Sequence, residues 1–130
     1  MSKDLIQIPP ELIALFSGKD VSDIIPFKKE IFLLNDFVAG TAFATELNKV
    51  LGDLEPGVLL SLRRHPENEV DENAIGIYYR DVRIGWVHRR YNVILARLMD
   101  SGKMFTCKIV GKDTSNPDWS RIDVNIFMLD

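Results

Sequence analysis

The sequence predicts a mainly β domain of about six short strands and two or three short helices, folded as a small, strongly bent sheet or barrel. Three observations support this prediction. The apolar runs are short and are separated by turn residues such as Pro56-Gly57. One segment, 91–99, has apolar residues at helical spacing. The closing segment, 121–129, alternates apolar and polar residues as a half-buried strand does.

Residues 1–36 are expected to form a helical or irregular arm, ahead of a domain at residues 37–130. Within the arm, prolines at the start of segment 8–16 and a glycine after it favour a short helix. The apolar segment 31–34 is compatible with a strand that ends at Asn35. The arm is expected to dock on the domain through three apolar side chains, Leu12, Leu15 and Phe16.

The elements of the domain follow in order. A strand at 37–43 precedes a short helix at 45–51, where apolar residues recur at helical spacing. Further strands are expected at 58–64, 74–79, 83–88, 104–111 and 121–129. The second and third of these form a hairpin. The helix at 91–99 follows the hairpin, and Gly102 ends it as a left-handed cap.

Trp86 has two interpretations. By strand alternation it shares a face with Ile84, so it lies in the core if Ile84 does. Alternatively, its ring is a platform on which a nucleic-acid base stacks.

The composition narrows the class of protein. The chain has 130 residues and one cysteine, Cys107, so we expect one domain without an internal disulfide or a cysteine-based metal site. Cys107 is expected to be a buried, inert thiol because it lies within a strand.

No apolar run approaches the roughly 20 residues that span a bilayer. Without a signal peptide at the start of the sequence, a cytoplasmic location with no membrane contact is the simplest expectation.

A basic segment lies within an acidic chain. The net charge is −3, yet the segment from Arg80 to Lys112 has eight basic and two acidic residues. A basic region can bind phosphates even when the whole protein is acidic. The simpler interpretation is a solvated surface with spread charges.

The polar segment 65–77, HPENEVDENAIGI, directly precedes a strand. Its acids do not have the spacing of a calcium-binding loop, which requires a glycine at the sixth position and a glutamate at the twelfth. As a simple turn, it would satisfy its own backbone amides through Asn68, Asp71 and Asn73. That interpretation leaves the flanking Arg63 and Arg64 unexplained.

Motifs of an active site are absent from the sequence. There is no phosphate-binding glycine motif, no GxSxG, and no HExxH pairing for His65 and His88. We therefore expect a non-catalytic protein that needs no metal and no cofactor.

Several segments together resemble a HIRAN domain of the stand-alone bacterial type. They are VAGTAF at 38–43, LEPGVLLSLRRHPENEVDENAIGIYY at 54–79 and IGWVHRRYNVILARLMDSGK at 84–103. The likeness covers about residues 37–113, and the C-terminal strand is expected to belong to it. Its most specific marks are the PxNxxDxNAI loop, the glycine strand before Val87 and the helix that ends in DxGK.

The resemblance implies an OB-like β-barrel that binds single-stranded DNA and captures its free 3′-hydroxyl end. Such domains occur beside helicase and nuclease modules, which makes those proteins candidate partners and suggests a link to DNA repair or replication. By position, Asp71 matches the acid that accepts from the 3′-hydroxyl, and Asn68 matches the amide beside it. His88 and Arg89 match a basic pair, and phosphates are expected to follow Arg89. Two further arginines, Arg90 and Arg64, complete this expected phosphate path.

The sequence departs from the end-binding members at one place. Those members carry an Arg-Tyr-Tyr step, where this sequence has Ala42-Phe43-Ala44. Only Phe43 can stack on a base there, so binding is expected to be weaker and more salt-dependent. The leading hypothesis is a nucleic-acid-binding module, with DNA and RNA both open. The alternative is a protein-interaction or regulatory domain that has lost end recognition and uses the arm and the barrel rim.

Overall fold

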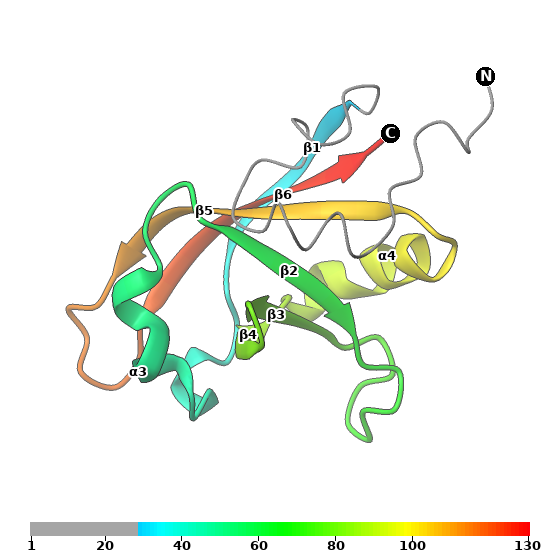
Figure 1. Ribbon diagram of the computed structural model, residues 1–130. Helices are drawn as coiled ribbons and strands as arrows, with labels where there is room; N and C mark the ends of the chain where they lie inside the picture. Colours follow the sequence, from blue (N-terminus) through cyan, green and yellow to red (C-terminus); the bar gives the residue numbers. More distant parts are fainter. Residues whose placement is uncertain (1–28) are drawn as a thin grey trace.

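The computed structural model describes residues 29–130, in which six antiparallel strands form one sheet (Figure 1). Their order across the sheet is β1-β6-β5-β2-β3-β4. The strands are β1 Glu30–Phe37, β2 Leu59–Arg64, β3 Ile75–Tyr79, β4 Val82–Trp86, β5 Met104–Asp113 and β6 Arg121–Leu129. The helices are α3 Leu47–Val50 and α4 Arg89–Asp100, with 3₁₀ turns η2 Thr41–Phe43 and η3 Leu51–Asp53. The predicted mainly β class with short helices is confirmed.

The sheet is strongly bent but does not close into a barrel. Its two edges approach at a single bridge between Ala39, which follows β1, and Trp86 at the end of β4. Each of these residues donates its backbone N–H to the carbonyl oxygen of the other at 2.8 Å. A Cβ atom on Gly85 would lie 2.4 Å from the Ala39 carbonyl oxygen, so glycine is needed where the edges approach.

The core lies inside the bend of the sheet. It includes Ile122, Val124 and Ile126 of β6, which the alternating pattern predicts to share one face. Cys107 of β5 is also fully buried, and its burial raises the pKa of the thiol to about 12. The expectation of a buried, unreactive cysteine is consistent with that environment.

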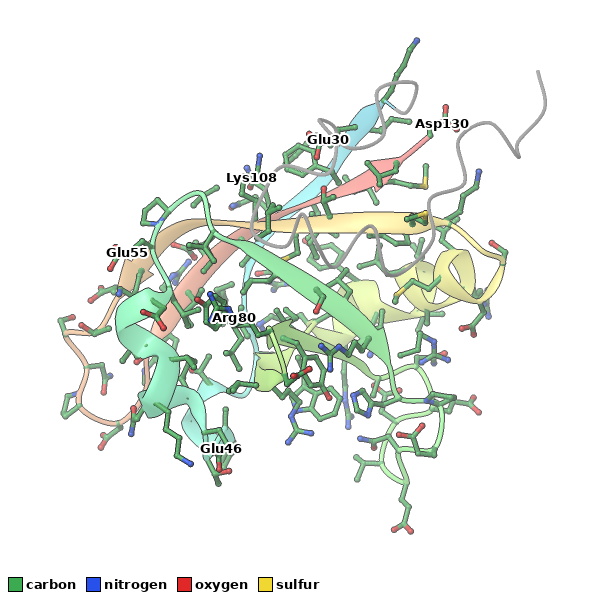
Figure 2. The ribbon with its side chains drawn as sticks, in the orientation of Figure 1. Glu30, Glu46, Glu55, Arg80, Lys108 and Asp130 are labelled. Carbon is green, nitrogen blue, oxygen red and sulfur yellow. The ribbon has the colours of Figure 1, made fainter. Side chains whose placement is uncertain are left out.

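β1 contains the strand expected at 31–34 and extends it to Phe37. Residues 30–37 pair with β6 from Leu129 to Asp123, although the sequence places residues 30–36 in an arm. Glu30 and Asp130 therefore lie at the same end of the sheet (Figure 2). Asn35, interpreted as the end of a strand, lies within it, because it pairs with Asn125 of β6, and its side-chain amide also donates to the Val124 carbonyl. The predicted helix at 8–16 and its docking residues lie outside the described residues.

The strand predicted at 37–43 is wrong. β1 ends at Phe37, and Gly40 adopts the left-handed conformation with φ of 74°. That conformation turns the chain into η2, so residues 41–43 form a 3₁₀ turn instead of a strand. Farther along, Gly102 follows α4 with φ of 99°, which confirms the predicted left-handed cap.

β4 contains a bulge that changes the environment of Trp86. Ile77 pairs with Gly85 and Tyr78 pairs with Arg83, so Ile84 has no partner on β3. The extra residue breaks the two-residue alternation. Ile84 is fully buried, whereas Trp86 is half-buried on the outer face. The prediction that Trp86 follows Ile84 into the core is therefore wrong.

Candidate nucleic-acid interface

The loop between β2 and β3, residues 65–74, is folded by its own polar side chains. The Asn68 side-chain oxygen accepts hydrogen bonds from the backbone N–H groups of Val70 and Asp71, at 2.9 and 3.0 Å. One carboxylate oxygen of Asp71 accepts from the backbone N–H of Asn73 at 2.9 Å. Asn68 and Asp71 therefore shape the turn, as the simple-turn interpretation expects.

Arg64 fastens this loop to α4. Its Nη1 donates to the carbonyl oxygens of Glu72 and Ala74, at 3.1 and 2.9 Å. Its Nε and Nη2 donate to the two carboxylate oxygens of Asp100 at the end of α4, at 2.9 and 3.1 Å. Hydrogen bonding to Arg64 lowers the pKa of Asp100. The guanidinium group is thus occupied within the protein.

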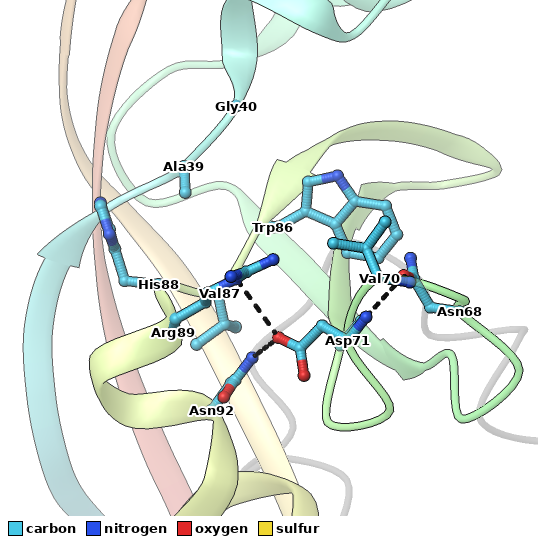
Figure 3. Close-up of a pocket in the computed structure, with 11 residues that line it drawn as sticks. Ala39, Gly40, Asn68, Val70, Asp71, Trp86, Val87, His88, Arg89 and Asn92 are labelled. Atoms are coloured by element: carbon cyan, nitrogen blue, oxygen red, sulfur yellow. Dashed lines mark hydrogen bonds and ion pairs between the residues drawn. The ribbon is translucent and has the colours of Figure 1, made fainter.

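A cavity of about 480 Å³ lies between this loop, the segment after β1, the end of β4 and the start of α4 (Figure 3). Its lining includes four of the seven residues predicted for the site, Asn68, Asp71, His88 and Arg89. It also includes seven others, Ala39, Gly40, Val70, Ala74, Trp86, Val87 and Asn92. Three predicted site residues, Phe43, Arg64 and Arg90, are outside this lining.

Asp71 is the negative centre of the cavity. Its second carboxylate oxygen accepts a hydrogen bond from the Asn92 side-chain amide at 2.7 Å and lies 3.7 Å from Arg89 Nε (Figure 3). The hydrogen bond from Asn92 lowers the pKa of Asp71, as do the backbone N–H of Asn73 and the nearby arginines. Asp71 is therefore ionised at neutral pH. A carboxylate has about four acceptor positions, and the hydrogen bonds from Asn73 and Asn92 use two of them.

Trp86 and Val70 form an apolar part of the same cavity. Both side chains line it, and Figure 3 shows them near each other beside the loop that carries Asp71. Val70 is 79% exposed. A half-buried indole with an apolar neighbour can accept the flat face of a base.

The four lining residues predicted from the sequence do not all point into the cavity. The Arg89 side chain is 72% exposed and reaches towards Asp71. The His88 ring instead points away from Asp71 (Figure 3) and packs edge-on against Phe37, with ring centroids 4.6 Å apart. Its Nε2 is buried without a hydrogen-bond partner among the described residues. The contribution of His88 to the cavity wall is therefore its backbone at the start of α4 more than its ring.

Two other predicted residues lie elsewhere on the surface. Arg90 donates to the Asp36 carboxylate, with Nη2 and Oδ1 2.7 Å apart, and so ties α4 to β1. Phe43 is 85% exposed on η2.

Sequence reasoning missed Asn92 and misplaced Trp86. A signal for Asn92 is present, because it lies three and four residues before Leu95 and Ala96 on the buried face of α4. A polar residue on such a face needs a hydrogen-bond partner, and here that partner is Asp71. The bulge that moves Trp86 has no comparable signal in the sequence.

Two further features are absent from the part of the chain that the structure describes. No helix within residues 29–130 is long and apolar enough to cross a membrane. Over the same residues, no three histidine, cysteine or acidic side chains gather as metal ligands would.

The open, bent sheet of six strands has the OB-like architecture of a known domain class. The model of the HIRAN domain family matches residues 31–128, and the chain belongs to that family. A search of curated proteins gave no match.

Three solved structures resemble the fold. A protein from Lactobacillus plantarum is 22% identical, with a TM-score of 0.70, 79% of this chain covered and 98% of that chain. The crystal structure of the HIRAN domain of human HLTF is 17% identical, with a TM-score of 0.60 and coverage of 77% and 78%. The NMR structure of the HLTF HIRAN domain in its DNA-bound conformation is 19% identical, with a TM-score of 0.55 and 83% of each chain covered.

Proposed function

We propose that this chain is a non-catalytic nucleic-acid-binding module that takes the 3′ end of single-stranded DNA into the cavity beside Asp71. The observation that carries the proposal is that an ionised carboxylate, an exposed guanidinium and an indole line one cavity, through Asp71, Arg89 and Trp86. Membership of the HIRAN family, with one similar domain known in a DNA-bound conformation, supports the same conclusion.

Each of these groups matches one part of a terminal nucleotide. An acceptor position of Asp71 that no protein donor uses takes a hydrogen bond from the 3′-hydroxyl, whereas the charge of a 3′-phosphate is repelled. Arg89 pairs with the phosphate on the 5′ side of that nucleotide, and Trp86 stacks on its base.

The start of α4 adds to the attraction for phosphate. His88 occupies the N-cap position without a side-chain hydrogen bond to the first turn. The backbone N–H groups of Arg89 and Arg90 therefore lack a side-chain cap, and the positive end of the helix dipole faces the cavity. This contribution supplements the charge of Arg89.

In this proposal the remaining predicted residues have lesser roles. Phe43 is exposed enough to stack on a base that extends beyond the cavity.

Helicase or nuclease proteins are the proposed partners, and DNA repair or replication is the proposed setting.

Fluorescence anisotropy tests the proposal with a 5′-labelled single strand that carries either a 3′-hydroxyl or a 3′-phosphate. We expect the hydroxyl strand to bind about tenfold more tightly, which corresponds to one charge-assisted hydrogen bond. Asp71→Asn should remove that preference. Glu69→Gln is the matched control, because Glu69 is an exposed acid of the same loop that does not line the cavity.

Two outcomes would count against the proposal. If neither strand binds at low salt, the chain is not a nucleic-acid-binding module. If both strands bind equally, Asp71 does not recognise the end, and the affinity arises from the phosphate backbone alone.

A further inference from the structure

The outer face of β2, β3 and β4 carries a row of alternating cationic and aromatic side chains. In the antiparallel register Arg63 lies opposite Gly76, Gly76 opposite Trp86, and Tyr78 opposite Arg83. Residues that face each other across antiparallel strands share a side of the sheet. We define the outer row as five side chains, Arg63, His65, Tyr78, Arg83 and Trp86.

The aromatic members of the outer row are in contact. The His65 ring is parallel to that of Tyr78, with centroids 5.9 Å apart, and His65 Nε2 lies 2.7 Å from the Tyr78 hydroxyl oxygen. The same imidazole meets Trp86 edge-on, with centroids 5.1 Å apart. Gly76 makes room for this arrangement, because a Cβ there would lie 2.6 Å from the Tyr78 ring and 3.0 Å from His65 Nε2.

An arginine lies over each end of this aromatic group. Arg63 Cζ is 4.1 Å from the centroid of the Tyr78 ring, and Arg83 Cζ is 4.5 Å from that of Trp86. Such pairing holds a guanidinium over a ring while N–H groups at its edge can still donate to phosphate.

The charges of the outer row are more available than those of the predicted phosphate path. Arg64 and Arg90 form short hydrogen bonds to the carboxylates of Asp100 and Asp36. Arg83 is exposed and has no carboxylate partner within residues 29–130. Arg63 Nη2 donates to the carbonyl oxygen of Arg80, and its ion pair with Asp81, at 3.5 Å from a side chain that is 99% exposed, is weak in water.

The outer row is also continuous with the cavity. Trp86 belongs to both, and His65 begins the loop that carries Asp71. A strand whose last nucleotide lies in the cavity can therefore continue across the outer row without leaving a cationic and aromatic surface. This is the combination that binds single strands with little sequence preference.

We propose that the outer row is a second nucleotide-binding subsite, over which the strand runs 5′ from the cavity. Its phosphates pair first with Arg83 and then with Arg63, and its sugars pack against Trp86 and Tyr78, whose rings these arginines partly cover. The subsite rests on the proposed function of the cavity. It replaces the path along Arg90 and Arg64 that the sequence predicts.

The test compares 5′-labelled, 3′-hydroxyl strands of two and eight nucleotides, because only the longer one reaches across the row. The variant is Arg63→Gln with Arg83→Gln, which keeps a planar polar group over each ring and removes both charges. We expect it to bind the eight-nucleotide strand at least about tenfold more weakly and to lower the salt slope by about two, one for each phosphate that an arginine no longer neutralises. Binding of the dinucleotide should not change.

Arg97→Gln is the matched control, because Arg97 is an exposed arginine of α4 outside the row and the cavity. It should bind both strands as the unchanged protein does. If the double variant binds the longer strand normally, or loses both strands equally, the second subsite is wrong while the cavity proposal stands. If the unchanged protein binds neither strand, the proposed function itself is wrong.

Discussion

The carboxylate of Asp71 accepts a hydrogen bond of 2.7 Å from the side-chain amide of Asn92, which joins the loop at 65–74 to α4. Asn92 is buried, with 2% of its surface exposed, so water does not readily replace this bond. Because α4 is packed on the core through Leu95 and Ala96, the helix fixes the position of the charge. The loop alone would hold it less firmly.

Asn92→Ala should therefore loosen the site as well as the fold. We expect the free energy of unfolding to fall by about 1–3 kcal/mol, since a buried hydrogen bond is lost. The pKa of Asp71 should rise towards its ordinary value, because the largest cause of its lowering is removed. Urea unfolding and a carboxyl titration by NMR measure the two effects. The control is Asn48→Ala at an exposed asparagine, and an unchanged Asp71 pKa would contradict the account.

The stability of the protein should fall at acid pH. The pKa values of Asp71 and Asp100 are lowered from a reference of 3.8 by hydrogen bonds from Asn92 and Arg64. Groups with lowered pKa values stabilise the fold above the unfolded value, and this contribution is lost as the pH falls through the folded value. Urea midpoints should thus be level above about pH 5 and decline below the reference value. In Asp71→Asn the decline should be smaller, and an equal decline would show that Asp71 contributes nothing.

Gly85→Ala should destabilise the place where the sheet edges meet. The added Cβ would lie 2.4 Å from the Ala39 carbonyl oxygen and from Val38 Cγ1, so the backbone must move. A loss of about 1–3 kcal/mol is expected from such overpacking. Gly52→Ala serves as control, because no atom lies within 4 Å of the Cβ position there. Thermal unfolding of the two variants measures the difference, and equal melting temperatures would be evidence against a close approach.

Arg63 and Arg64 are adjacent in sequence but should behave differently. Arg64→Gln breaks the hydrogen bonds to Asp100 and to the loop carbonyls, and we expect a loss of about 1–2 kcal/mol in urea unfolding. Arg63→Gln should change stability less, because both the ion pair of Arg63 with Asp81 and its hydrogen bond to the Arg80 carbonyl are exposed to solvent. A weakened DNA affinity in Arg64→Gln without any loss of stability would make Arg64 a direct contact instead.

The elements that the sequence predicts correctly are those with a strong local pattern. The helix at 91–99 and the strand at 121–129 lie within α4 and β6, because apolar spacing determines which face is buried. The miss at 37–43 arises from Gly40, whose left-handed turn redirects an apolar run. The miss at Trp86 arises from a one-residue bulge, which reverses every later side chain.

The candidate site was only partly predictable for a different reason. Asn68, Asp71 and Arg89 are predicted from segments that resemble a HIRAN domain, and the fold brings the three residues to one cavity. Arg64 and Arg90 are basic residues in the same neighbourhood of the sequence, but their carboxylate partners lie 36 and 54 residues away along the chain. Such pairings depend on the register of the sheet and the position of α4, which local spacing does not encode.

The most direct test of the central claim is the fluorescence of Trp86 in a Trp119→Phe protein, where Trp86 is the one remaining tryptophan. If a 3′-hydroxyl single strand enters the cavity, base stacking should quench this fluorescence, and the quenching should saturate with the dissociation constant found by anisotropy. Binding seen by anisotropy while the fluorescence of Trp86 stays unchanged would contradict the claim, because the strand would then lie elsewhere on the protein.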